Sequence, residues 1–328
     1  MANFHLGWRI LAALAMLSVG SSLNSVNLDL KTLSQIDLSA LGTPNLNNYK
    51  MTYDVTVDSN CQYILLIEFE KPADQIPGNA SPDFQGVCQQ SGNTGNAPDG
   101  QPWHATRRYW MQFPSYVSDT TGFDHMSIYW RPCGLPPLGL RKSRFDVTFY
   151  NVIPQYRAFW TCSEVGIPRT CSPNQTSTLG RAQFVIPCLE RDPTFLANLP
   201  VGFEPDPTAP AAYQYEGLFS WNIDAVPKIA SNFTLPQFDL STYDGNAVAW
   251  RLMMPWSYVS GPNSTASSAH DYYVYQTLPQ LPASWNTTYD AGSGKITVSL
   301  GGSAGMCGAG FASAKAQQQG KPSRTLRS

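Results

Sequence analysis

Apolar and polar residues alternate along much of the chain, as in β-strands with one buried face. The clearest example lies at 51–57, where Met51, Tyr53, Val55 and Val57 alternate with Thr52, Asp54 and Thr56. Because successive side chains of a strand point to opposite faces, this period of two predicts a half-buried strand. A second run, at 63–69, is almost wholly apolar and predicts a more fully buried strand.

Further strand patterns predict an all-β fold. They lie at 108–113, 123–130, 145–152, 181–186, 216–224, 235–240, 247–254, 272–278 and 295–300. Asp244-Gly245 separates two of these runs and predicts a tight hairpin, because both residues tolerate positive φ. We therefore expect a sandwich or a barrel-like arrangement of antiparallel sheets, with long loops and few short helices.

Both ends of the chain depart from this pattern. Residues 1–22 predict a cleaved signal peptide, since Arg9 precedes the apolar run 10–19 and small residues follow it. That run is shorter than the roughly 20 residues of a membrane-spanning helix. We expect an N-terminal arm at 23–49 and a β domain at 50–300, with a Pro-rich connection at about 187–212. The Gly/Ala/Gln-rich segment 301–328 is expected to be a disordered tail.

The amino-acid composition argues against some classes of function. The 328 residues carry a formal net charge of −2, only 13% are charged, and 12% are aromatic. A chain without a basic excess is not expected to bind nucleic acid. After signal cleavage no membrane contact is expected either. We expect a secreted, extracellular protein.

Cysteines and sequons fit an oxidising compartment. The chain has seven cysteines, and we expect disulfides among the six that lie closest together: Cys61, Cys88, Cys133, Cys162, Cys171 and Cys188. Cys307 stands apart and is expected to be the odd one, either free or paired between chains. Four Asn-x-Ser/Thr sequons are the better glycosylation candidates, Asn174, Asn232, Asn263 and Asn286, while Pro82 weakens Asn79.

An ordered series of segments resembles a known family. The segments are 123–130, 132–134, 145–150, 199–205, 242–248, 254–256, 278–282, 288–290 and 298–300. Together, over about 118–301, they resemble the bacterial TTHB-like family, a domain of unknown function found in exported proteins. The family pattern has a histidine cluster suited to a metal or to proton transfer, where this chain has Leu135, Arg144, Thr148 and Ser220. The resemblance implies a member that keeps the scaffold and only His125 of that cluster.

Candidate chemistry is sparse. Outside the predicted signal peptide the histidines are His104, His125 and His270, the only candidate metal ligands of that type, and no spacing selects them as a site. A glycosidase-like pair would need two acids, and no motif selects two among Asp124, Asp146, Glu164, Glu190, Glu204 and Glu216. Among many aromatics, Trp256, Tyr258, Tyr272 and Tyr273 lie nearest to polar loops and are the candidates for an exposed binding surface.

These observations favour a secreted, disulfide-linked glycoprotein with a non-enzymatic binding or structural role. Its expected partner is an extracellular glycan or protein, no cofactor is expected, and the order of any oligomer stays open. The alternative is an extracellular metal-dependent enzyme whose site is not visible in the sequence.

Overall fold

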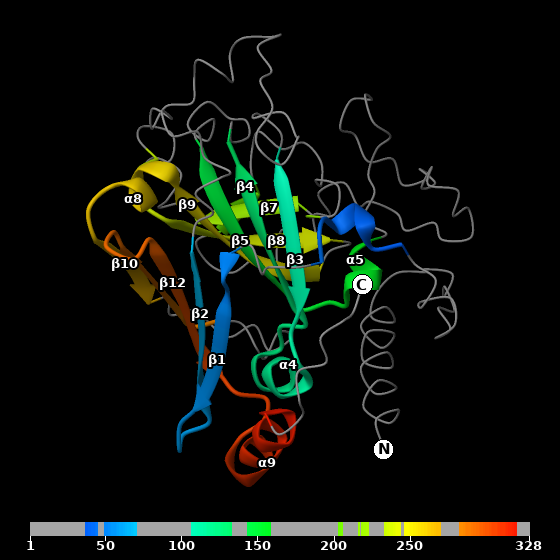
Figure 1. Ribbon diagram of the computed structural model, residues 1–328. Coiled ribbons are helices and arrows are strands. Elements are labelled where there is room, and N and C mark those ends of the chain that lie inside the picture. The colour runs from blue at the N-terminus through cyan, green and yellow to red at the C-terminus, as the bar shows by residue number, and fades with distance from the viewer. Residues whose placement is uncertain are drawn as a thin grey trace.

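Two antiparallel β-sheets face each other across one hydrophobic core (Figure 1). The computed structural model of the protein describes residues 37–44, 49–70, 106–132, 143–158, 203–205, 216, 218–222, 233–243, 246–269 and 282–319. The expected all-β sandwich is confirmed. The predicted signal peptide and the predicted strands at 181–186 and 272–278 lie outside the described residues.

The smaller sheet has five strands. In order across the sheet they are β1 (Thr52–Val57), β2 (Gln62–Glu70), β12 (Lys295–Ser303), β11 (Ser284–Asp290) and β10 (Ser264–Ala269). The alternation at 51–57 forms the hairpin partner of the apolar run, with Val55 opposite Leu65. The sequence did not indicate β10 or β11, because Ser, Thr and Asn dominate both.

The larger sheet has seven strands. Their order is β3 (Arg107–Gln112), β4 (His125–Arg131), β5 (Arg144–Tyr150), β9 (Asn246–Pro255), β8 (Gln237–Tyr243), β7 (Leu218–Asn222) and β6 (Phe203–Pro205). Tyr243 of β8 pairs with Asn246 of β9, which confirms the hairpin predicted at Asp244-Gly245. The sheet thus joins strands from distant parts of the chain.

The core lies between the sheets and explains the alternation of both. Phe145, Val147 and Phe149 of β5 are fully buried there. From β2 of the opposite sheet, Leu65 and Ile67 are also fully buried. A buried aliphatic or aromatic side chain contributes about 1.5–3 kcal/mol, so this apolar layer is the main force that holds the sheets together.

Short helices lie at the ends of strands. They are η1 (Ser39–Leu41), α4 (Ser115–Thr121), α5 (Pro154–Arg157) and α8 (Trp256–Ser260). A longer helix, α9 (Gly308–Gln319), packs beside α4 at one end of the sandwich (Figure 1). The expectation of a disordered tail from residue 301 is therefore wrong as far as Gln319. Phe311 packs against the core, and Lys315 Nζ donates to Asp54 Oδ1 at 2.6 Å, which fixes α9 to β1.

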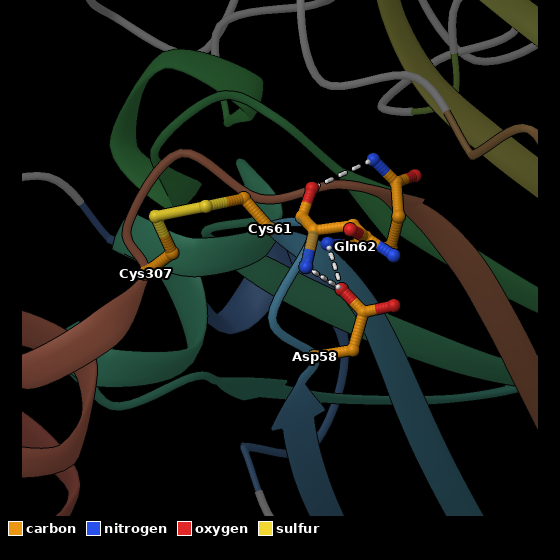
Figure 2. The surroundings of a disulfide bond; sticks show 5 residues. Asp58, Cys61, Gln62 and Cys307 are labelled. Atoms are coloured by element: carbon orange, nitrogen blue, oxygen red, sulfur yellow. Dashed lines mark hydrogen bonds between the residues drawn. A yellow bond between two sulfur atoms is a disulfide. The ribbon is translucent and has the colours of Figure 1, made fainter.

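Cys307 is not the odd cysteine. It forms a disulfide with Cys61, and Figure 2 shows this bond beside the turn that joins β1 to β2. Asp58 Oδ1 accepts hydrogen bonds from two backbone N–H groups of that turn, including Gln62 N at 2.8 Å. The pairing of β12 with β2, with Ser303 opposite Gln62, brings the two cysteines together. The other five cysteines lie outside the described residues.

Part of the expected N-terminal arm extends the larger sheet. Thr43 forms a parallel bridge to the edge strand β3, where Thr43 N donates to Arg108 O at 2.9 Å. Gly42 makes this approach possible, because its φ is +110° and a Cβ there would lie 2.3 Å from the same carbonyl oxygen. Among the described helices, none is long and apolar enough to cross a membrane.

Candidate functional site

The seven-stranded sheet has a second buried face, which we call the outer face. On β5, Arg144, Asp146, Thr148 and Tyr150 point away from the core, since they alternate with the three core residues of that strand. Antiparallel partners share a face, so the pairing extends this surface across the neighbouring strands. The outer face comprises Arg108, Trp110, Gln112, His125, Ser127, Tyr129, Arg131, Arg144, Asp146, Thr148, Tyr150, Arg251, Asp239 and Ser241.

Burial of this face is the main departure from the sequence-based expectation. Asp146 and Arg144 are 0% exposed, and Arg251 is 1% exposed. Lys, Arg, Asp and Glu are almost never fully buried unless they are paired. The polar side chains of these strands therefore form a buried layer of charged groups and are not exposed to solvent.

Asp146 is the centre of an ion network. Its carboxylate accepts hydrogen bonds from Arg131 Nε at 2.5 Å and Arg144 Nε at 2.7 Å. Arg251 Nη1 lies 3.7 Å from the same carboxylate. Three guanidiniums, each from a different strand, thus converge on one acid.

Two further carboxylates complete what we call the outer-face network. Asp239, opposite Arg251 in the register, accepts from Arg251 Nε at 3.0 Å and also from Nη2. Glu216 accepts from Arg131 Nη2. The network contains three arginines and three acids, namely Arg131, Arg144, Arg251, Asp146, Asp239 and Glu216.

The three acids are electrostatically unequal. Burial alone would raise the pKa of Asp146, but Arg144, Arg131 and Arg251 outweigh it and hold that pKa well below its usual range. Burial would raise the pKa of Glu216, but the neighbouring arginines, chiefly Arg131, outweigh burial and lower it. For Asp239 burial prevails over Arg251 and raises its pKa to about 6. The pKa values of two neighbouring acids are therefore pushed in opposite directions.

A second cluster forms around Arg157, which α5 places against the outer face. Arg157 Nη1 donates to Ser127 Oγ at 2.7 Å and lies 3.3 Å from His125 Nε2. Its Nη2 donates to the hydroxyl of Tyr129, and its guanidinium lies 3.8 Å from the ring centroid of Tyr150. These contacts fill the space above the small side chain of Ser127.

His125 does not offer a ring nitrogen to a metal ion. Its Nε2 faces a guanidinium, which can only donate, so the proton belongs on Nδ1, 3.5 Å from Asp124 Oδ1. Burial lowers the pKa of His125 to about 4, although Asp124 opposes this shift. His104 and His270 lie outside the described residues, and no cluster of three or more potential metal ligands occurs among the described ones.

The aromatic candidates that the structure describes are not exposed. Trp256 is 7% exposed and packs edge-on against Trp130, and Tyr258 is 4% exposed and donates to Thr287 O at 2.8 Å. The prediction of a binding surface at these two residues is wrong, because α8 folds back over the core and takes both side chains with it. Tyr272 and Tyr273 lie outside the described residues.

The described sequons are accessible. Asn263 and Asn286 are both exposed, and Asn286 lies on the face of β11 that points away from the core. Asn263 Oδ1 accepts a hydrogen bond from the backbone of Ala291 at 2.8 Å. Asn174 and Asn232 lie outside the described residues, so glycosylation stays a prediction.

Sequence reasoning missed most of the outer-face network. Only Asp146 and Glu216 were among its candidate acids. The available signal was a charged residue within an otherwise apolar strand, as at Arg251 in β9. That signal becomes specific only once the register places Asp239 opposite it.

No protein-family model, curated protein or solved structure matches this chain. The resemblance to the TTHB-like family therefore stays a prediction. Two of the positions where that family has histidines, Arg144 and Thr148, share the outer face with His125. The class that the structure itself defines is an all-β sandwich with one sheet that is apolar inside and charged outside.

Proposed function

We propose that the chain is a secreted binding protein without catalytic activity, and that its ligand binds on the outer face of the seven-stranded sheet. The observation that carries this proposal is a pair of buried donors beside the outer-face network, Arg108 Nε and Trp110 Nε1, which bond to none of the described residues. This side also contains the rings of Trp110 and Tyr129, which are 7% and 1% exposed.

The fold alone does not require such a face. Replacing a buried ion pair by apolar residues of similar volume is often neutral or stabilising. The inner face of the same strands demonstrates that apolar residues suit this sheet. The ion pairs of the outer-face network therefore serve to specify which strands adjoin, and the unbonded donors beside them are the groups that a ligand would use.

The outer face is least covered along its β3 edge. At β3, the edge strand, Arg108 is half-buried and Gln112 is exposed, while the positions on β4 and β5 are buried. Trp110 Nε1 is buried and makes no hydrogen bond with the described residues. A buried donor without a partner costs about 1–3 kcal/mol, so a ligand that accepts from it would gain that amount.

One observation favours a catalytic alternative. Asp146 and Asp239 both contact Arg251, and their pKa values are shifted in opposite directions. Such a pair is the usual arrangement of a general acid and a carboxylate that stays ionised. We favour binding because guanidiniums already hold both carboxylates.

The test uses two matched tryptophans. Both Trp110 and Trp130 carry a buried indole N–H without a hydrogen bond, but Trp110 lies on the outer face and Trp130 in the core. The secreted protein is screened against polysaccharides and extracellular proteins, and the affinity for any hit is measured for both Trp→Phe variants. We expect Trp110→Phe to weaken binding about fivefold or more and Trp130→Phe to change only stability. Equal affinities in the two variants, or turnover of a ligand, would refute the proposal.

A further inference from the structure

The two sheets of described strands have four edge strands, and the unpaired N–H and C=O groups of an edge can pair with a strand of another molecule. Three of these edges carry a feature that hinders such pairing. β6 is only three residues long and ends in Pro205. Thr43 bridges part of β3, and Lys315 of α9 donates to Val55 O of β1 at 2.8 Å. Short length, proline, a covering segment and a lysine are all means by which proteins protect edges.

The fourth edge, β10 (Ser264–Ala269), differs from these three. Its six residues, Ser-Thr-Ala-Ser-Ser-Ala, include no charge and no proline. Figure 1 shows β10 at the margin of the five-stranded sheet, as the strand order requires. Tyr258 of α8 donates to Ser264 O at 3.3 Å, but Tyr258 belongs to the core, so this contact does not cover the edge. An uncharged edge of this length is a template for pairing between molecules.

Two of the sequons lie at this same edge. Asn263 immediately precedes β10, and Asn286 of β11 lies opposite Ser267 of β10 in the register. Both asparagines are exposed, and Asn286 is on the side of the sheet that points away from the core. The third residues of the two sequons, Thr265 and Thr288, lie opposite each other. Both possible glycosylation sites therefore lie beside the edge that has no other protection within the described part of the chain.

The side chain of Asn263 has the orientation that glycosylation needs. Its Oδ1 accepts a hydrogen bond from Ala291 N at 2.8 Å, while its Nδ2 bonds to none of the described residues. In N-glycosylation this nitrogen forms a bond to the anomeric carbon of an oligosaccharide. The bond from that carbon to a lipid diphosphate breaks, and one amide proton is released. The amide oxygen remains an acceptor, so a glycan on Asn263 is compatible with the hydrogen bond to Ala291.

We propose that N-linked glycans on Asn263 and Asn286 cover the β10 edge and prevent β10 from pairing with β10 of a second copy of this chain. Such pairing would be symmetric, since both copies would use the same strand. A glycan is bulky and solubilising, and it would protect this edge as α9 protects the opposite edge at β1. This inference goes beyond the ligand-binding proposal and shares with it only the premise that the protein is secreted.

Glycopeptide mass spectrometry on the full secreted chain tests the modification itself. We expect a glycan on both Asn263 and Asn286, and we expect the glycoprotein to be a monomer by light scattering. A secreted protein that lacks a glycan on either asparagine, or a glycoprotein that dimerises through β10, would overturn the proposal.

Two substitutions, Thr265→Ala and Asn286→Gln, remove both sites without changing the core. Thr265→Ala takes away the hydroxyl that a sequon needs at its third position and leaves Asn263 bonded to Ala291. Light scattering on the double variant should give at least double the monomer mass, at a concentration where the glycoprotein is a monomer. Thr297→Ala makes the same change on β12, outside any sequon, and should leave the protein monomeric. A double variant that stays monomeric would contradict the proposed role of the glycans.

A lysine on the edge distinguishes strand pairing from a general loss of solubility. Ser267→Lys, added to the double variant, should restore the monomer, because a charged side chain on an edge strand blocks pairing. Thr52→Lys adds the same charge at an exposed position of β1 and should not restore it. Failure of Ser267→Lys, or equal rescue by both lysines, would show that the association does not use β10.

If the double variant is not secreted, the folded glycoprotein is trimmed instead. An endoglycosidase that cleaves within the glycan core leaves one sugar on each asparagine. Because β10 is about 20 Å long, two single sugars cannot cover it, and the mass measured by light scattering should again at least double. A monomer that persists after complete trimming would overturn the proposal.

Discussion

Replacing Asp146 by Asn tests whether the outer-face network is held together as the structure indicates. The variant keeps the shape of the side chain and removes its charge. Arg131 and Arg144 then lose the carboxylate to which their Nε atoms donate, at 2.5 and 2.7 Å. Three buried guanidiniums of the network remain against two carboxylates, so the network acquires one uncompensated positive charge.

The magnitude follows from that imbalance. Breaking a buried ion pair by removing one partner costs about 3–5 kcal/mol, because the remaining charge stays desolvated. The amide oxygen of Asn still accepts one hydrogen bond, while its NH2 group faces guanidinium donors. We therefore expect a loss of about 3–5 kcal/mol, a large part of the 5–15 kcal/mol typical of a folded domain.

Equilibrium urea unfolding, followed by tryptophan fluorescence at neutral pH, measures this loss. Asp54→Asn is the matched control, since Asp54 is half-exposed and accepts from Lys315 Nζ at 2.6 Å. An exposed pair contributes at most about 1 kcal/mol. A loss for Asp146→Asn as small as that of the control would refute the reasoning, because the network would then be hydrated or unnecessary.

Three other changes test separate parts of the structure. The pKa of His125 is about 4 in the folded protein and ordinarily near 6.5. Between pH 6.5 and pH 4 the unfolded chain therefore binds more protons than the folded protein. The free energy of unfolding should fall by up to about 3 kcal/mol as the pH decreases through this range. Urea midpoints across that range should have a smaller pH slope in His125→Gln. Gly42→Ala should cost about 1–3 kcal/mol, because its Cβ would clash with Arg108 O, and an unchanged melting temperature would contradict this. Cys307→Ser removes a disulfide between residues 246 positions apart. It should cost about 2–5 kcal/mol, measured by urea unfolding, and α9 should be proteolysed faster. If α9 stays resistant to proteolysis, packing alone holds it in place.

The alternation of apolar and polar residues predicted the strands, but not whether water or protein covers their polar face. A period of two separates two faces, and it does so equally whether the polar face meets water or protein. For β1 the polar residue Thr52 is exposed, as the pattern suggests. For β5 the polar residues are buried, because other segments of the chain, among them Arg157 of α5 and Glu216, pack over that face. Which outcome applies depends on what packs over a sheet face, and alternation along one strand does not specify that.

The two errors at the C-terminus have the same origin. Composition suggested disorder after residue 301, and distance along the chain suggested an unpaired Cys307. Both are overturned by the pairing of β12 with β2, which places Ser303 opposite Gln62 and lets Ala304 N donate to Cys61 O at 2.8 Å. Once that strand is in place, the cysteines are neighbours and α9 begins beside α4.

The outer face combines two kinds of group, and they serve different ends. Carboxylates and guanidiniums that bond to each other across β4, β5, β9 and β8 fix the register of four strands, so their loss should appear in stability. Arg108 Nε and Trp110 Nε1 are buried donors that bond to none of the described residues, and they add only cost to the fold. A structural role accounts for the first kind and not for the second. A ligand that accepts from those donors accounts for the second, which is why Asp146→Asn should act on unfolding and Trp110→Phe on affinity.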